Sequence, residues 1–315
     1  MYALIGSSAK RRPTLLTGLA VGLLALALIA TSTPTQAAAT RDRPSPAALL
    51  RLQIAMDAMV ADGTPGMYVQ IRNGNRITEL RSGRPDVDSS RPWTDRSRFR
   101  VASVTKTFTA ALIMQLVSEG RMRLSDPVER WLPGQAPYGR QITVRQLLNH
   151  TSGVPPYEDL QFLLDSFDDF DRQFTPQQLL ARIEGRPLLF APGTASSYSN
   201  TGFVLLGLIV ERVGGQPLDV ALRRRILRPL GLTDTTFEMD RYFPAPRVRG
   251  YGSRPGTSDP AVDVTTMNPS WTWGVGNLVS SGRDVLTFLR ALMTGQVVPR
   301  PQLEAMKVVD PIAYD

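Results

Sequence analysis

The chain has 315 residues, 42% of them hydrophobic, and a formal net charge of +8. It has no cysteine and one histidine, which excludes disulfides and thiolate metal sites and argues against a catalytic zinc site. Arginines are spread along the chain without a Lys/Arg block, so the charge does not predict nucleic-acid binding. The length allows one large domain or two average ones.

The first 39 residues are typical of a secretory signal peptide. A basic patch at Lys10, Arg11 and Arg12 precedes the apolar residues 15–30, and small residues at 37–39 offer a cleavage site. We therefore expect a secreted or cell-envelope protein. A retained N-terminal anchor is the alternative, and the pair Arg11-Arg12 leaves the Sec and twin-arginine routes open.

The mature chain is expected to begin with a helix and a hairpin. Apolar spacing over residues 46–62 predicts an amphipathic helix. Two alternating runs, 67–72 and 76–80, flank Asn73-Gly74, a pattern typical of a β-hairpin. A two-stranded hairpin is marginal alone, and few strand candidates follow it, so part of a sheet is expected to be missing from this sequence.

Helical patterns dominate the remainder. Residues 103–119 and 201–213 predict the two strongest helices, each ended by glycine. Further helices are expected over 143–148, 176–183, 218–226 and 284–293, a loop over 250–262, and a short buried segment over 274–279. This order predicts an α/β domain interrupted by an all-helical insert, with parts at 40–102, 103–270 and 271–315.

Two short strings carry the chemistry. Ser103-Val104-Thr105-Lys106 places a hydroxyl and an amine one helical turn apart, and Tyr198-Ser199-Asn200 adds a phenol and an amide. These groups can supply a nucleophile, two proton-transfer groups and a substrate hydrogen bond. Either Lys106, if burial lowers its pKa, or Tyr198, if its phenolate is stabilised by the ammonium, can serve as the base.

Each of these residues also has an ordinary structural alternative. Ser103 or Asn200 can cap a helix N-terminus, Lys106 can be a solvated lysine, and Tyr198 a buried aromatic. His150 is the only possible base of a Ser-His-Asp triad. A structural role, in which His150 binds a backbone carbonyl, is the favoured interpretation because it lies outside both strings.

Five collinear strings resemble the serine penicillin-recognising family, in particular secreted D-alanyl-D-alanine carboxypeptidases and class C β-lactamase-like hydrolases. They cover residues 99–106, 142–153, 190–193, 198–201 and 227–232. The resemblance implies the β-lactamase/transpeptidase-like fold, an antiparallel sheet flanked by helices plus a helical insert.

The resemblance also implies an activity. Ser103 would form an acyl-enzyme with help from Lys106 and Tyr198, Asn200 would bind the substrate amide or orient Lys106, and Trp271 would lie beside the cleft. The expected substrates are a peptidoglycan stem peptide, a β-lactam or an ester, without metal or cofactor. An esterase or β-lactamase is an alternative.

One family motif is absent. No Lys-Thr-Gly or His-x-Gly follows Asn200. We therefore expect that several dozen residues, carrying an edge strand and the second oxyanion donor, are missing, and that the chain is an inactive or non-catalytic penicillin-binding fragment unless they are restored.

Overall fold

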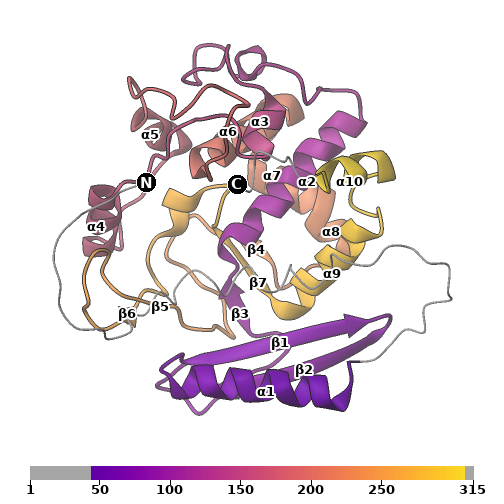
Figure 1. The fold of residues 1–315 in the computed structure, drawn as a ribbon, viewed down its shortest axis with the longest axis vertical. Helices are drawn as coiled ribbons and strands as arrows, with labels where there is room; N and C mark the ends of the chain where they lie inside the picture. The colour runs from indigo at the N-terminus through magenta and orange to yellow at the C-terminus, as the bar shows by residue number, and fades with distance from the viewer. Residues whose placement is uncertain (1–43, 309–315) are drawn as a thin grey trace. The chain divides into compact units, whose positions relative to one another are not determined.

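The computed structural model describes residues 44–308, which open with helix α1 (Pro46–Ala61) and a hairpin. Ser45 caps α1 by accepting a hydrogen bond from the Ala48 amide at 3.1 Å. The antiparallel strands β1 (Gly66–Asn73) and β2 (Arg76–Gly83) confirm the predicted hairpin, and α1 packs on β2 (Figure 1). Asn73 pairs with Arg76, so the turn is Gly74-Asn75, one residue later than expected.

Short strands form two further sheets. The order β3-β7-β4 brings together β3 (Arg98–Arg100), β7 (Leu278–Ser281) and β4 (Thr236–Phe237), all antiparallel. The buried segment expected over 274–279 therefore ends in the central strand of a sheet. Because these strands have two to four residues, they are too short to show an alternating pattern in the sequence. A small pair, β5 (Tyr251–Gly252) and β6 (Val262–Asp263), lies at the predicted loop.

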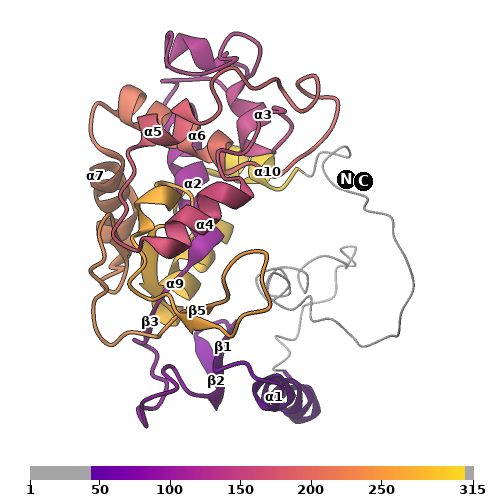
Figure 2. The ribbon, with the colours of Figure 1, turned by 90° about the vertical axis from the view of Figure 1, so that its left-hand side faces the viewer.

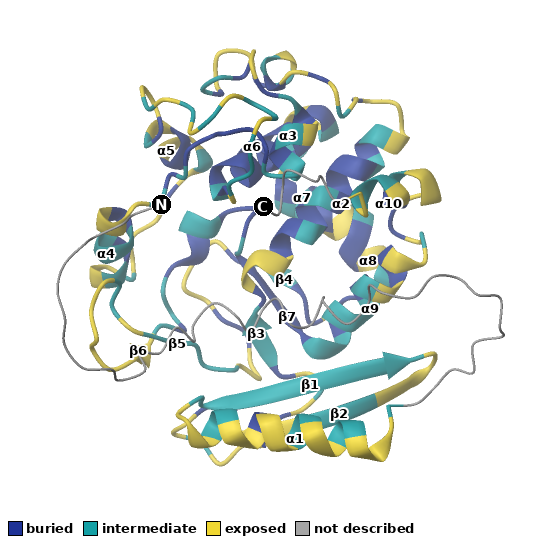
Figure 3. Cartoon of the chain, viewed as in Figure 1, coloured by how far each residue is buried: buried dark blue, intermediate teal, exposed yellow. Residues whose placement is uncertain are grey.

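Helices α2 (Thr105–Ser118) and α6 (Asn200–Gly214) pack against each other in the core. Residues 201–210 of α6 are all buried, and α2 buries nine of its fourteen residues (Figure 3). Gly215 ends α6 in the left-handed conformation at φ 69°, as the sequence predicted. Figure 2 shows the hairpin and α1 at the opposite end from this helical part.

The remaining helices mostly match their predictions. The helix expected over 143–148 forms as α3, with a reciprocal capping box between Thr143 and Gln146. The helix expected over 218–226 is wrong in detail, because a π-turn separates two short α-helical pieces. The remaining bounds are α3 Val144–Leu148, α4 Leu160–Asp168, α5 Pro176–Ala181, α7 Leu218–Leu222, the π-turn Arg223–Leu227, α8 Arg228–Leu230, α9 Gly282–Met293 and α10 Arg300–Met306, with 3-10 turns at Ala102–Val104, Val128–Arg130 and Pro269–Thr272.

The predicted fold class is confirmed: antiparallel sheets are flanked by helices in an α/β arrangement with a largely helical middle. The three-part division of the chain stays a prediction, as does the missing part of the sheet, although β1 and β2 pair with no other strand within residues 44–308. The predicted signal sequence lies outside the described residues. Over the range that the structure covers, no helix combines the length and apolarity needed to cross a membrane.

Candidate active site

Ser103 lies in the 3-10 turn Ala102–Val104 that leads into α2. Ala102, the residue before it, has φ 46°, a sparsely populated conformation for a residue with a side chain. Neither the turn nor α2 has a side-chain cap, so the Ser103 hydroxyl does not serve the helix as an N-cap. The side chain is exposed, and its oxygen instead meets two other functional groups.

Lys106 is the first of these groups. Its Nζ donates to Ser103 Oγ at 3.1 Å and to the Val275 carbonyl at 3.1 Å. The residue is only 6% exposed, and Nζ lies 4.9 Å from the centre of the Tyr198 ring and 5.7 Å from that of Phe203. Burial lowers the pKa of Lys106 to about 7, against the opposing effect of the negative Glu158. A large fraction of this amine is therefore neutral near pH 7.

Tyr198 is the second functional group that contacts Ser103. It lies in the loop just before α6, and its hydroxyl donates to Ser103 Oγ at 2.7 Å. Burial raises the pKa of Tyr198, the Ser103 hydrogen bond opposes that shift, and the Glu158 charge adds to it. The phenol therefore keeps its proton at neutral pH. Of the two bases left open by the sequence, the geometry and charge favour Lys106 as proton acceptor and Tyr198 as proton donor.

Asn200 is the first residue of α6, and the N-cap is its neighbour Ser199, which accepts a hydrogen bond from Gly202 N–H. The Asn200 amide nitrogen donates to Glu158 Oε1 at 2.6 Å. Asn200 Oδ1 and Glu158 Oε2 are both buried without a hydrogen-bond partner. Burial raises the pKa of Glu158, opposed by hydrogen bonds and by Lys106.

Glu158 was missed by the sequence reasoning. It belongs to the acidic pair Glu158-Asp159 shortly after Pro155-Pro156, where a single carboxylate has no distinguishing signal. Only the fold brings it to Asn200, 42 positions later.

His150 was expected to have a structural role and to bind a backbone carbonyl; the structure agrees with the structural role, but the backbone group bound by the ring is an amide, and the ring lies beside the site. Its ring centre lies 4.6 Å from that of Tyr198, and its Nδ1 accepts a hydrogen bond from Ser199 N–H at 3.2 Å. Since Nδ1 is engaged there, the structure offers no Ser-His-Asp triad at Ser103, whose hydroxyl contacts Lys106 and Tyr198 instead.

Trp271 lies in the 3-10 turn Pro269–Thr272 and is partly buried. Its carbonyl accepts a hydrogen bond from the Tyr157 hydroxyl at 2.6 Å, and its ring meets Phe162 edge-on at 6.1 Å. These contacts place it in the packing between α4 and the turn. Its role in substrate binding stays a prediction.

Other possible sites are less suited to chemistry. Within residues 44–308 no group of three or more His, Asp or Glu residues could hold a metal ion. A cavity of about 590 Å³ lies beside α7 and β4, and its lining includes Asp219, Arg223 and Glu238 but none of the residues around Ser103.

Comparisons with known proteins show the family of this chain. The family model described as Beta-lactamase matches residues 52–311, so the chain belongs to the serine penicillin-recognising β-lactamase/transpeptidase family, whose members are serine hydrolases. The solved structure of a D-stereospecific amidohydrolase from Streptomyces sp. is similar at 40% identity and a TM-score of 0.76. That match covers 82% of this chain and 77% of the other.

Two curated relatives are similar over shorter stretches. Esterase EstB from Burkholderia gladioli is 36% identical over 53% of this chain and 45% of its own length. Penicillin-binding protein 4 from Amycolatopsis lactamdurans is 32% identical over 75% of this chain and 61% of its own length. The chain thus spans less than two thirds of either relative.

Proposed function

We propose that this chain is a serine hydrolase that cleaves amides or esters of D-amino acids through an acyl-enzyme on Ser103. The observation that carries the proposal is the convergence of two proton-transfer groups on one nucleophile. Lys106 Nζ and the Tyr198 hydroxyl lie 3.1 Å and 2.7 Å from Ser103 Oγ. Nucleophile and base within hydrogen-bond reach are what covalent catalysis requires.

In the proposed reaction, neutral Lys106 takes the Ser103 proton while Oγ bonds to the substrate carbonyl carbon. The carbonyl electron pair moves to oxygen, where the Ser103 N–H at the start of the helical segment can stabilise it. When the intermediate collapses, the bond to the amine or alcohol breaks, and the leaving group receives the proton held by Lys106 through the Tyr198 hydroxyl. Water then cleaves the ester by the same steps.

The pair Glu158 and Asn200 supports a substrate with a free α-amino group. Glu158 Oε2 and Asn200 Oδ1 are buried acceptors without donors, while a protonated amine supplies three donors and a complementary charge. An unsatisfied buried carboxylate oxygen costs free energy, and an amine that reached Glu158 would recover it. Similarity to the Streptomyces amidohydrolase, which is D-stereospecific, supports the D-configuration.

A D-alanyl-D-alanine carboxypeptidase that also binds β-lactams, or a β-lactamase, is the second candidate. It is favoured by the residues 99–106 and 198–201 and by the similarity to a penicillin-binding protein. Its natural substrate would be a peptidoglycan stem peptide. For either candidate we propose export directed by residues 1–39, which mass spectrometry of the N-terminus of the protein after expression in a bacterial host would test.

The test is hydrolysis by the full chain of D-phenylalanine amide, its L-enantiomer, N-acetyl-D-phenylalanine amide, a D-Ala-D-Ala peptide and a chromogenic cephalosporin. In a chain that also carries the third motif, Lys-Thr-Gly or His-x-Gly, we expect turnover of the first substrate and about 10⁴-fold or greater loss in Ser103→Ala. Residues 1–315 alone are expected to be at least about 10²-fold slower, because the second oxyanion donor is lacking. Ser118→Ala, on an exposed position of the same helix, is the matched control. Equal turnover of the two enantiomers or of the N-acetylated amide would exclude the proposed substrate class, and preference for the D-Ala-D-Ala peptide would establish the second candidate.

A further inference from the structure

Tyr198 carries a proton-transfer group on a half-exposed side chain. Its side chain is 54% exposed, so packing alone fixes the phenol less firmly than it fixes the buried Lys106. The phenol must nevertheless stay 2.7 Å from Ser103 Oγ for proton transfer. The contacts that hold the Tyr198 backbone therefore matter for the geometry of the site.

A single residue, His150, holds the backbone on both sides of Tyr198. The His150 carbonyl accepts a hydrogen bond from Ser197 N–H at 3.0 Å, and His150 Nδ1 accepts one from Ser199 N–H at 3.2 Å. The imidazole also packs on the Tyr198 ring, tilted by 35°. The centre of the imidazole lies 5.4 Å from that of the Phe203 ring. The loop and the phenol are thereby tied to the end of α3.

His150 reaches both amides because of an unusual backbone conformation. It has φ 62°, in the left-handed region that few non-glycine residues adopt, although His, like Asn and Asp, occurs there more often than most. Strained backbone of this kind persists only where surrounding contacts enforce it, and it is concentrated at functional sites.

The protonation state of His150 suits this role. Because Nδ1 accepts from Ser199, it carries no proton, and the neutral ring must hold its proton on Nε2. Burial, together with the positive charge of Lys106, lowers the pKa of His150 to about 4. The acceptor is therefore intact throughout the neutral range.

We propose that His150 is the positioning residue for Tyr198: its carbonyl and Nδ1 bracket the tyrosine and hold the phenol against Ser103. This inference rests on the proposed acyl-transfer reaction at Ser103. It assigns the only histidine of the chain to the proton-transfer apparatus without making it a base.

The central experiment compares His150→Asn with His150→Leu. Asparagine Oδ1 occupies the place of Nδ1 in the side chain, can accept from Ser199, and tolerates the left-handed conformation, whereas leucine has a similar shape and no acceptor. Tyr138→Asn and Tyr138→Leu are matched controls, because Tyr138 has the same φ of 62° and its backbone carbonyl bonds to Gln141 rather than to the site.

The readouts are the rate of Ser103 acylation by a fluorescent penicillin, the dissociation constant of the preceding complex, and hydrogen exchange at the Ser199 amide. In His150→Leu we expect about 10²-fold slower acylation, an unchanged dissociation constant and faster exchange at Ser199. His150→Asn should recover most of both the rate and the protection. The proposal would be overturned by a wild-type rate of acylation in a folded His150→Leu protein. An equal loss of acylation rate in His150→Leu and His150→Asn would also overturn it.

Two further measurements keep the proposal separate from the proposed function. If the wild-type protein is not acylated by any probe, the proposed reaction fails. Hydrogen exchange at the Ser199 amide still tests whether His150 holds the loop that carries Tyr198. If His150→Leu does not fold, the nitrogen-15 NMR spectrum of the wild-type imidazole decides, since one histidine gives an unambiguous signal. The Nε2–H tautomer supports the proposal, and the Nδ1–H tautomer overturns it.

Discussion

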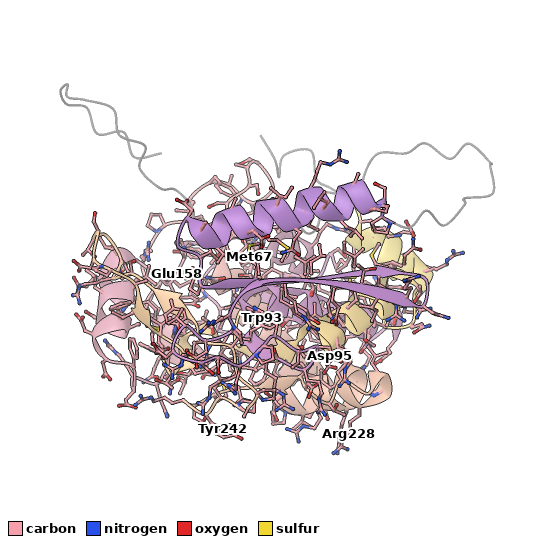
Figure 4. All side chains as sticks on the ribbon, turned by 90° about the horizontal axis from the view of Figure 1, so that it is seen from below. Met67, Trp93, Asp95, Glu158, Arg228 and Tyr242 are labelled. Carbon is pink, nitrogen blue, oxygen red and sulfur yellow. The ribbon has the colours of Figure 1, made fainter. Side chains whose placement is uncertain are left out.

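The helical core and the hairpin region are packed very differently. Residues 201–210 of α6 are all buried, whereas α1 buries only Met56 and the hairpin only Ser82 (Figure 3). Figure 4 shows the hairpin from below, with α1 running alongside its strands and Trp93 on their other side. Trp93 stacks on Tyr68 of β1 with 5.9 Å between ring centres.

The reactive groups all come from the better-packed region. Ser103 lies in the turn that leads into α2, Lys106 lies in the first turn of α2, and Tyr198 precedes α6, so close packing between these helices holds the three groups. The hairpin meets the rest of the molecule at α9, where a Cβ on Gly282 would lie 2.5 Å from Gln70 Oε1. Because of this difference, we expect substitutions in the helical core to affect both acylation and stability, and substitutions in the hairpin to affect stability alone.

Among variants that keep the Ser103 nucleophile, the largest effect is expected from Lys106→Arg. Arginine keeps the charge but cannot be deprotonated, so it cannot take the Ser103 proton. We expect acylation to fall about 10³-fold, as for the loss of a general base. Penicillin labelling rates measure this, with Lys307→Arg, on the exposed end of α10, as the control. Acylation within a few-fold of wild type would exclude Lys106 as the proton acceptor.

The pH dependence of acylation follows from the same group. Since burial lowers the pKa of Lys106 to about 7, its neutral form predominates above that pH. The acylation rate should therefore fall about tenfold per pH unit below 7 and level off above it. Glu158→Gln removes a charge that raises the Lys106 pKa, so it should move the midpoint to lower pH. A profile that is flat from pH 5 to 9, or a midpoint that rises in this variant, would contradict the assignment.

Two glycines of α6 test how closely the core is coupled to the site. A Cβ at Gly207 would lie 2.6 Å from the ring of Trp273, two residues before the carbonyl that binds Lys106, whereas at Gly202 the nearest atoms are 3.6 Å away. Gly207→Ala should lower the free energy of unfolding by about 1–3 kcal/mol and also slow acylation. Gly202→Ala should change stability by less than about 1 kcal/mol. Similar unfolding free energies for Gly207→Ala and Gly202→Ala would mean that the Trp273 ring moves aside at little cost.

The smallest effect is expected in the hairpin. The Tyr68 hydroxyl donates to Glu79 Oε1 at 2.5 Å across β1 and β2. Tyr68→Phe should cost about 0.5–1.5 kcal/mol of stability, typical for one hydrogen bond, and leave acylation unchanged. Chemical denaturation and penicillin labelling measure the two quantities. A change in acylation larger than the change produced by Gly207→Ala would show that the hairpin controls the site more than the core does.

The sequence by itself determined much of this protein. Periodic apolar residues, glycine stops and an Asn-Gly pair predicted α1, α2, α6 and the hairpin, because local propensity and burial pattern agree in those segments. The pair Ser103 and Lys106 was also readable, since a spacing of three residues places both side chains on one face of a helical turn. Strands of two to four residues were not readable, because their pairing partners are far apart in the chain.

Only the tertiary structure decided how the site works. It brought Tyr198 to Ser103 across 95 residues, and burial of Lys106 lowered its pKa and so favoured it as the base. It also brought Glu158 to Asn200 and placed His150 against the loop that carries Tyr198. The physical reason is that hydrogen bonds and desolvation depend on distance and burial, and neither quantity is encoded at any single position of the chain.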